Sequence, residues 1–311
     1  MGLTSLEGTI KENANNCTNA HFMLIEGMSK LLTRKVKRCE SLDFHVSGLK
    51  WKFVIRSDVV KDNISFFLDI TDEKCTGSNW QVNCSVKLSV VSQTGPPDIC
   101  KVFVMCFDEK HPSWGQDIFI TDKVLEESKK KYLLNDKAVF SAEITNVKPN
   151  FLKVTSISRT MGTAESLKLM DVARKNSRFT WKITRFSSFD GVTHSSYEFT
   201  LGPRRWKLEM YPKGDKGGEG HLSFYLTATD YVPNLPKGPT LAVYKLRLLD
   251  QLKRNHKEPK YQALFAPGAN SRGCRKYIPL TELHSTSNGY LVNDQIYLSV
   301  EFLIVSTTEY L

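Results

Sequence analysis

The polarity of the chain alternates with a period of two residues over many short segments. Apolar and polar positions alternate in Phe199–Leu201, Trp206–Met210 and Leu222–Leu226, and the pattern continues in 243–249 and 296–304. Such alternation is typical of half-buried β-strands. Clusters of glycine, proline and asparagine separate these segments, as turns do. About eight short strands in each stretch of roughly 130 residues, without a long amphipathic helix, predict an antiparallel β-sandwich.

An internal repeat divides the chain. Tyr132–Asp136 (YLLND) recurs 158 residues later as Tyr290–Asp294 (YLVND), and Ile64–Leu68 recurs at the same spacing as Leu222–Leu226. Repeats of this kind are the signature of a duplicated structural unit. The sequence therefore predicts an N-terminal extension, a first domain, a linker and a second domain, at residues 1–19, 20–146, 147–176 and 177–311.

The linker contains a segment with a different spacing. Between Thr163 and Arg174, apolar residues recur loosely at the intervals of a helix. We therefore expect a short helix in this segment. The expected fold class is all-β, with two tandem antiparallel β-sandwiches joined by a partly helical linker.

The second copy carries four ordered motifs, which are Phe179–Ser187 (FTWKITRFS), Trp206–Gly214 (WKLEMYPKG), His221–Leu226 (HLSFYL) and Gly289–Asp294 (GYLVND). These motifs resemble the signatures of the MATH domain, also called the TRAF-C or meprin-and-TRAF-homology fold. Two such domains in tandem resemble the TRAF-like proteins of plants. The resemblance implies a β-sandwich whose function is to bind short peptide segments of other proteins.

The first copy is a weaker version of the same pattern. Met23 replaces the first tryptophan, and Arg56–Asp58 stands where Tyr-Pro-Lys is expected, although Trp51 and Leu133–Asp136 are kept in order. The most direct interpretation of the large aromatic residues on alternating strands is that they anchor the cores. We therefore expect Trp51, Trp181 and Trp206 to be buried. The Asn-Asp pairs at 135–136 and 293–294 are expected to cap turns.

The resemblance also implies which residues would line a peptide-binding groove. In the second copy, the positions that match groove aromatics hold Tyr225 and Tyr244, and Arg272 stands where the family has a loop tryptophan. In the first copy, Phe67 and Trp114 occupy such positions. We expect the second copy to be the working groove, with a preference for acidic peptides through Arg272, and the first copy to be the weaker site.

Composition and charge narrow the function. The chain has 311 residues, of which 41% are hydrophobic and 24% charged, which is a globular composition. Glu7, Lys11 and Glu12 interrupt the region where a signal peptide needs apolar residues, so we expect a cytoplasmic protein. Of the net charge of +10, residues 177–311 carry +6 and residues 20–146 carry +1. No basic segment with interleaved aromatic residues is visible, which argues against nucleic-acid binding and for protein partners.

No motif for catalysis is visible in the sequence. The histidines lack metal-binding spacing, and there is no nucleophile elbow or phosphate-binding loop. Cys75, Cys84, Cys100 and Cys106 lie farther apart than the paired ligands of structural zinc sites, so we expect free cysteines without a metal. The glycine-rich segment Lys213–Gly220 is interpreted as a flexible hairpin loop. We therefore expect no enzymatic activity and no cofactor.

Three functional alternatives follow from these observations. The first is a non-catalytic module that binds peptide segments of partner proteins, with a link to ubiquitin-dependent turnover by analogy with the family. The second is the substrate-docking region of a ubiquitin-specific protease without its catalytic domain. The third is a basic β-domain that contacts nucleic acid. The basic run Arg34–Arg38 has two interpretations, a nuclear-import patch or a solvated loop.

Overall fold

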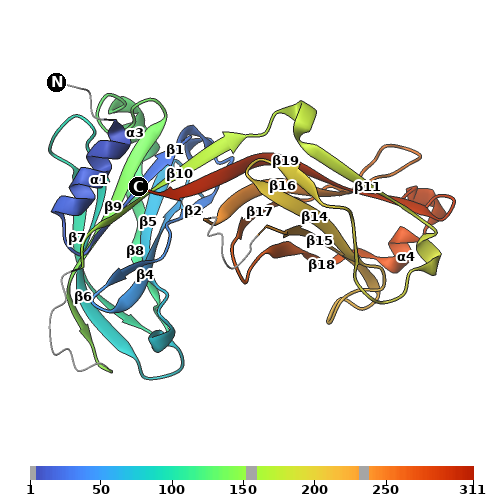
Figure 1. Cartoon of the computed structure of the whole chain (residues 1–311), viewed down its shortest axis with the longest axis horizontal. Coiled ribbons are helices and arrows are strands. Elements are labelled where there is room, and N and C mark those ends of the chain that lie inside the picture. The colour runs from blue at the N-terminus through green and yellow to red at the C-terminus, as the bar shows by residue number, and fades with distance from the viewer. Residues whose placement is uncertain (1–4, 152–159, 231–237) are drawn as a thin grey trace. The chain divides into compact units, whose positions relative to one another are not determined.

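The computed structural model describes residues 5–151, 160–230 and 238–311. Contacts divide the chain into two compact units, here called the first and the second domain: Met1–Leu169 with Thr308–Leu311, and Met170–Thr307. Both domains are built mainly from β-strands arranged in two layers (Figure 1). The predicted all-β class with tandem sandwiches is therefore confirmed.

The strands of the first domain are β1 (Ala20–Glu26), β2 (Arg38–Glu40), β3 (Phe44–Val46), β4 (Leu49–Arg56), β5 (Asn63–Ile70), β6 (Gln81–Val91), β7 (Ile99–Asp108), β8 (Ser113–Thr121), β9 (Lys137–Pro149) and β10 (Thr163–Asp171). One sheet has the order β10-β1-β9-β6-β7. The other has the order β2-β4-β5-β8, with β3 also paired to β4. Strands β1 and β10 are parallel, and the other pairs are antiparallel.

The second domain repeats this arrangement with β11 (Arg178–Thr184), β12 (His194–Ser195), β13 (Phe199–Leu201), β14 (Arg204–Tyr211), β15 (His221–Ala228), β16 (Thr240–Leu248), β17 (Lys260–Phe265), β18 (Ser271–Pro279) and β19 (Gln295–Tyr310). One sheet has the order β17-β16-β19-β11. The other has the order β12-β14-β15-β18, with β13 also paired to β14. The apolar side chains that alternate along these strands fill the space between the two sheets.

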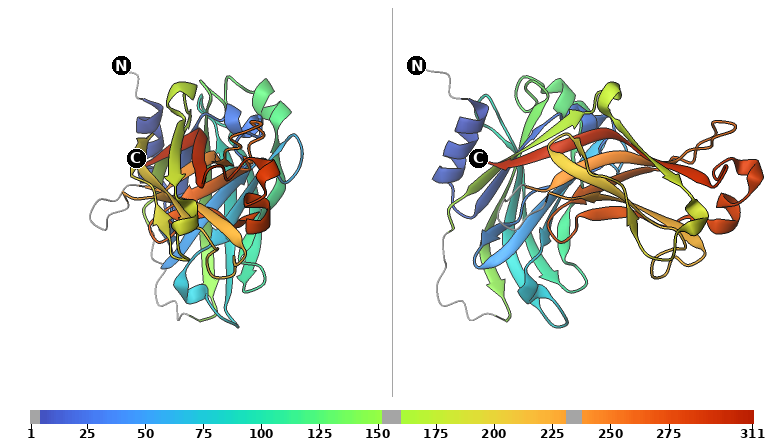
Figure 2. Two further views of the ribbon diagram at one scale, coloured as in Figure 1. Left: turned by 90° about the vertical axis from the view of Figure 1, so that its right-hand side faces the viewer. Right: turned by 45° about the vertical axis from the view of Figure 1, so that its right-hand side comes forward.

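The helices are short, and they are α1 (Leu6–Asn16), α2 (Ser29–Leu32), α3 (Asp122–Glu127) and α4 (Leu280–Leu283), with 3₁₀ turns η1 (Glu73–Cys75), η2 (Arg174–Asn176), η3 (Phe186–Ser188) and η4 (Thr286–Asn288). Ser5 caps α1, since its Oγ accepts a hydrogen bond from the N–H of Gly8 at 3.1 Å. Ile10 and Ala14 of α1 are buried against Phe22 of β1. This helix therefore covers the outer face of the first domain's larger sheet (Figure 2).

The helix predicted between Thr163 and Arg174 is wrong. Most of this segment forms β10, which pairs in parallel with β1 from His21 opposite Thr163 to Glu26 opposite Lys168. The edge of β1 offers unpaired backbone groups, and pairing with them outweighs a weak local preference for helix. Only the short turn η2 is helical.

The indole rings show that the cores of the two domains are built in the same way. Trp51 and Trp206 are fully buried, and each donates a hydrogen bond from Nε1 to a backbone oxygen five residues earlier. The acceptors are Val46 at 3.2 Å and Leu201 at 3.0 Å. Trp181 is partly buried and packs against the core of the second domain. The predicted core positions of Trp51 and Trp206 are confirmed.

The repeated Asn-Asp pairs act as caps in both domains. Asp136 accepts hydrogen bonds from the backbone N–H and the hydroxyl of Ser29, at 2.6 and 2.8 Å. Asp294 accepts the same two bonds from Ser187, at 2.8 and 2.7 Å. Each aspartate thus closes the turn after the first strand of its domain, as expected from the sequence.

Candidate functional site

In each domain, one end of the smaller sheet is formed by a nine-residue strand, β8 or β18. Within the described residues, β18 pairs only with β15, and β8 pairs only with β5. An edge strand presents a row of unpaired N–H and C=O groups on its outer side, which can hydrogen-bond to an added strand. These two edges are therefore places where an extended peptide can join the structure.

A glycine on each edge strand lies under an aromatic ring of the neighbouring strand. Gly273 of β18 is paired with Tyr225, and Gly115 of β8 is paired with Phe67. A Cβ at either glycine would lie 2.8 Å from the ring atom Cδ1 and 2.2 Å from a backbone oxygen. Only glycine fits there. Both aromatic side chains remain partly exposed on the outer face of the sheet.

The ring of Tyr225 is held by polar partners. Its hydroxyl donates a hydrogen bond to Oδ2 of Asp215 at 2.6 Å, and Nε of Arg275 lies 3.4 Å from Oδ1 of the same carboxylate. Burial, and then the hydrogen bond to Asp215, raise the pKa of Tyr225 to about 12. The tyrosine therefore stays a neutral hydrogen-bond donor at physiological pH.

The glycine-rich segment between β14 and β15 provides Asp215. The prediction that it connects two strands is confirmed, and its contacts with the sheet are specific. The backbone N–H of Asp215 donates to Oγ of Ser223 at 3.0 Å, and that hydroxyl donates to the backbone oxygen of Arg275. A Cβ at Gly218 would lie 2.7 Å from this same oxygen. The glycines thus allow the loop to pack closely against β18 beside Tyr225.

Tyr244 does not line the groove, so the prediction that it contacts a peptide is wrong. Its side chain is fully buried in the core of the second domain. The reason is topological, since β16 follows β15 in the chain but belongs to the opposite sheet. The Tyr244 hydroxyl donates to the backbone oxygen of Arg272 at 3.3 Å, and burial raises its pKa. This tyrosine therefore links the two sheets.

Arg272 lies on β18 but not beside Tyr225. It pairs with Leu226, whose side chain is buried in the core, while Tyr225 pairs with Gly273. Because side chains alternate along strands, Arg272 and the Tyr225 ring belong to opposite faces of the sheet. The structure instead places Arg275 beside Tyr225. The sequence analysis missed Arg275, which follows Gly273 by two residues, the spacing that returns to the same face of a strand.

The candidate residues of the first domain are similarly separated. Phe67 lies on the outer face of its sheet over Gly115, whereas Trp114 pairs with the buried Leu68. Trp114 is 39% exposed, and its ring centroid is 5.7 Å from that of His111. The two aromatic residues therefore do not form one pocket.

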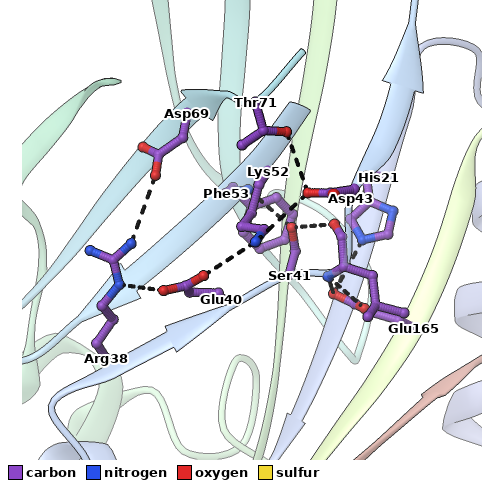
Figure 3. A network of polar contacts seen from close by, with 11 residues as sticks. His21, Arg38, Glu40, Ser41, Asp43, Lys52, Phe53, Asp69, Thr71 and Glu165 are labelled. Carbon is purple, nitrogen blue, oxygen red and sulfur yellow. Dashed lines mark hydrogen bonds and ion pairs between the residues drawn. The ribbon is translucent and has the colours of Figure 1, made fainter. Parts of the chain in front are cut away.

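A charged network covers the outer face of the first domain's smaller sheet (Figure 3). Glu40 accepts hydrogen bonds from Nε of Arg38 at 2.7 Å and from Nζ of Lys52 at 3.3 Å. Burial alone would raise the pKa of Glu40, but the charges of Arg38 and Lys52 outweigh burial and lower it. Nearby, burial raises the pKa of Asp69 despite its hydrogen bond from Ser113.

A buried pair in the interior of the first domain links β10 to its neighbours. His21 and Glu165 are almost completely buried, with Nε2 of His21 at 3.3 Å from Oε1 of Glu165. Both oxygens of Glu165 accept from the backbone N–H of Leu42 at 2.9 Å. The His21 ring stacks on Phe44, with centroids 4.6 Å apart.

The second domain has an apolar version of this stack. Phe179, 158 residues after His21, stacks on Phe199 with centroids 4.0 Å apart. Histidine therefore occupies this stacking position only in the domain whose first strand pairs with β10, where Thr163 and Glu165 are its polar partners.

The cysteines are free. Within the described parts of the chain, no group of three or more His, Cys, Asp or Glu side chains is arranged to hold a metal ion. The same residues include no helix long and apolar enough to cross a membrane.

Comparison with known proteins agrees with the geometry of the fold. The family model of the MATH domain matches residues 20–144 and 178–302, which together cover most of the chain. The chain therefore belongs to the MATH domain family. Domains of this family are generally protein-interaction modules.

Individual relatives in Arabidopsis thaliana are similar over about one domain. Ubiquitin C-terminal hydrolase 12 is 32% identical over 137 residues, which cover 43% of this chain and 12% of the relative. MATH domain and coiled-coil domain-containing protein At3g58210 is 32% identical over 130 residues, 40% of this chain and 38% of the relative. The chain thus spans less than half the length of either relative.

Proposed function

We propose that this chain is a non-catalytic protein-interaction module that binds extended peptide segments at β18 of the second domain. The observation that carries the proposal is the open edge of β18 beside the Tyr225 ring on Gly273. A peptide that adds to β18 gains main-chain hydrogen bonds, and its alternate side chains reach Tyr225 and Arg275.

The second domain is favoured over the first by the groups around its aromatic ring. Tyr225 combines an apolar ring with Asp215 and Arg275, and tyrosine and arginine are enriched among residues that dominate binding energy. In the first domain, Phe67 has no hydroxyl, and Trp114 lies on the other face of the sheet. We therefore treat Phe67 and Trp114 as the weaker site.

The test is to select twelve-residue peptides from a random library with the intact chain, and to measure the affinity of the enriched peptide by fluorescence anisotropy. We expect Tyr225→Ala to weaken binding at least tenfold, because it removes the central anchor. Tyr197→Ala is the matched control, since Tyr197 is 91% exposed. Hydrogen exchange should show new protection in β18.

Two results would contradict this assignment. Loss of binding in Trp114→Ala alone, with protection in β8, would move the site to the first domain. Unchanged binding in Tyr225→Ala and Trp114→Ala, with both variants folded, would exclude both edges.

A second candidate function follows from the relatives. The similarity to a protein named as a ubiquitin C-terminal hydrolase supports a link to ubiquitin-dependent turnover, either as an adaptor or as the docking region of such a hydrolase. Sequencing full-length transcripts tests whether the chain is the docking region of such a hydrolase. A reading frame that continues past Leu311 into a catalytic domain would support it, and a stop codon there would contradict it.

We place the module in the cytoplasm. Of the basic run considered as a nuclear-import patch, Arg34 is paired with Asp122 and Arg38 with Glu40. These contacts favour a structural role for the run. A fluorescent fusion of the chain that accumulates in the nucleus through Lys35 and Lys37 would contradict this view.

A further inference from the structure

The two edge strands differ sharply in charge although their positions correspond. With the repeat spacing of 158 residues, β8 and β18 align from end to end, and both end their sheets. Strand β8 has one acidic residue, Asp117, and no lysine or arginine. Strand β18 has no acidic residue and three basic ones, Arg272, Arg275 and Lys276, at the positions of Trp114, Asp117 and Ile118.

The neighbouring strand of the other sheet also differs between the two domains. Val102 and Val104 of β7 are 68% and 86% exposed, and the corresponding residues of β17 are Lys260 and Gln262. Strands β17 and β18 lie against each other, with the side chains of Tyr261 and Cys274 close together. These corresponding positions are thus mainly apolar in the first domain and polar or basic in the second.

The basic side chains of β18 are available to a partner. Arg275 is 59% exposed, and Lys276 is also exposed. Among the described residues, no acidic side chain lies within 4.0 Å of Arg272 or Lys276. Within the described parts of the chain, the guanidinium of Arg272 has a hydrogen bond only to the backbone oxygen of Ser271, at 3.2 Å. Two of the three cations therefore have no ion-pair partner within 4.0 Å among the residues that the structure describes.

We propose that the segment bound at β18 is acidic, rich in aspartate and glutamate, and belongs to a partner protein. The inference rests on the proposed function, because it specifies the peptide that this edge takes. Neighbouring side chains of an added strand point to opposite faces. One carboxylate can therefore reach Arg275 on the face of Tyr225, while the next reaches Arg272 on the other face.

The physical basis is charge complementarity at an open edge. Hydrogen bonds between guanidinium and carboxylate groups are stronger than neutral ones, and two can form in parallel on one arginine. The net charge of +6 carried by residues 177–311 also speeds the approach of an acidic chain at low salt. The first domain lacks this charge on β8 and would not select acidic peptides.

The experiment uses three synthetic fluorescein-labelled peptides of twelve residues with the intact chain. In each peptide, six positions hold alternating Val and Thr. The other six positions are all Asp in the first peptide, all Ser in the second and all Lys in the third. Anisotropy measures affinity at 50 and 200 mM salt, and hydrogen exchange locates the binding strand. We expect the Asp peptide to bind at least tenfold more tightly than the Ser peptide at 50 mM salt, with protection in β18.

Charge-reversal variants connect this preference to the edge. Arg272→Glu combined with Lys276→Glu should weaken the Asp peptide at least tenfold and leave the Ser peptide nearly unchanged. The matched control is Lys175→Glu combined with Lys182→Glu, which changes the net charge equally. Lys182 lies on β11, at the end of the other sheet away from β17. Near-equal loss in this control would overturn the specific role of β18.

The remaining outcomes separate this inference from the proposed function. Equal binding of the Asp and Ser peptides with protection in β18 would overturn the acidic preference and leave the peptide edge in place. Absence of protection in β18 with every peptide, including the library-selected one, would overturn both. Two further results would overturn the assignment of a carboxylate-bearing partner. One is binding of only a phosphoserine version of the Ser peptide, and the other is tighter binding of a twelve-nucleotide single-stranded DNA.

Discussion

At the scale of single residues, the two carboxylates in the charged network of the first domain have opposite effects on stability. The pKa of Glu40 is lowered, because the attraction of Arg38 and Lys52 outweighs the effect of burial, while burial raises the pKa of Asp69. A lowered pKa in the folded state means that the ionised group stabilises the fold above its unfolded-state pKa. A raised pKa means the reverse.

The pH dependence of two variants checks this difference. Glu40→Gln should lower the free energy of unfolding at pH 7, and the loss should fade as the pH drops through the folded-state pKa of Glu40. Asp69→Asn should raise the free energy of unfolding at pH 7, with no gain once Asp69 is protonated in both states. Urea unfolding between pH 3 and 7 measures both effects, and shifts of the same sign would contradict the assignment.

Trp206 should contribute more to the free energy of unfolding than Glu40 or Asp69. It is fully buried against the rings of Phe265 and Phe302, and its Nε1 has a backbone acceptor. Trp206→Ala should lower the free energy of unfolding by about 3–5 kcal/mol, because it leaves a cavity and an unpaired carbonyl. Tyr197→Ala, on the exposed surface, should change it by less than about 0.5 kcal/mol. Equal effects in urea unfolding would mean that the core assignment is wrong.

At the scale of elements, the pairing of β10 with β1 depends on a buried polar pair. Removal of Glu165 leaves the backbone N–H of Leu42 without its acceptor, and it takes away the carboxylate that lies 3.3 Å from Nε2 of His21. Breaking a buried pair costs more than replacing both members. The second domain shows that phenylalanine fits the position of His21, since Phe179 stacks there on Phe199.

A double-mutant cycle measures this coupling. Glu165→Leu alone should lower the free energy of unfolding by about 3 kcal/mol, and combination with His21→Phe should recover part of the loss. Hydrogen exchange of β10 should increase in the single variant. His45→Phe, at an exposed position of β3, is the control and should change neither quantity. Strictly additive effects would show that the pair is not coupled.

At the scale of the whole chain, two similar domains each have their own buried tryptophan. Trp51 contacts Phe107 in the first domain, and Trp206 contacts Phe265 in the second. Because each ring packs within its own domain, we expect calorimetry to show two transitions. Trp51→Ala should lower the temperature of one transition, and Trp206→Ala that of the other. A single transition shifted by either variant would show that the domains unfold together.

The sequence alone determined the duplication, the sandwich class and the buried tryptophans. These features depend on local alternation and on a repeat, both of which are visible along the chain. The capping role of Asp136 and Asp294 could also be predicted, because the pairs stand between an apolar pair and a strand.

Only the tertiary structure decided which residues share a surface. Tyr244 was predicted to lie beside Tyr225, but successive strands of a sandwich can belong to opposite sheets, and burial of Tyr244 follows from that topology. Arg272 and Arg275 are three residues apart, and pairing with β15 decides which of them lies beside Tyr225. The segment after Thr163 forms a strand because the edge of β1 is there to pair with it. Sheet membership, register and edge pairing are long-range properties, so no local pattern contains them.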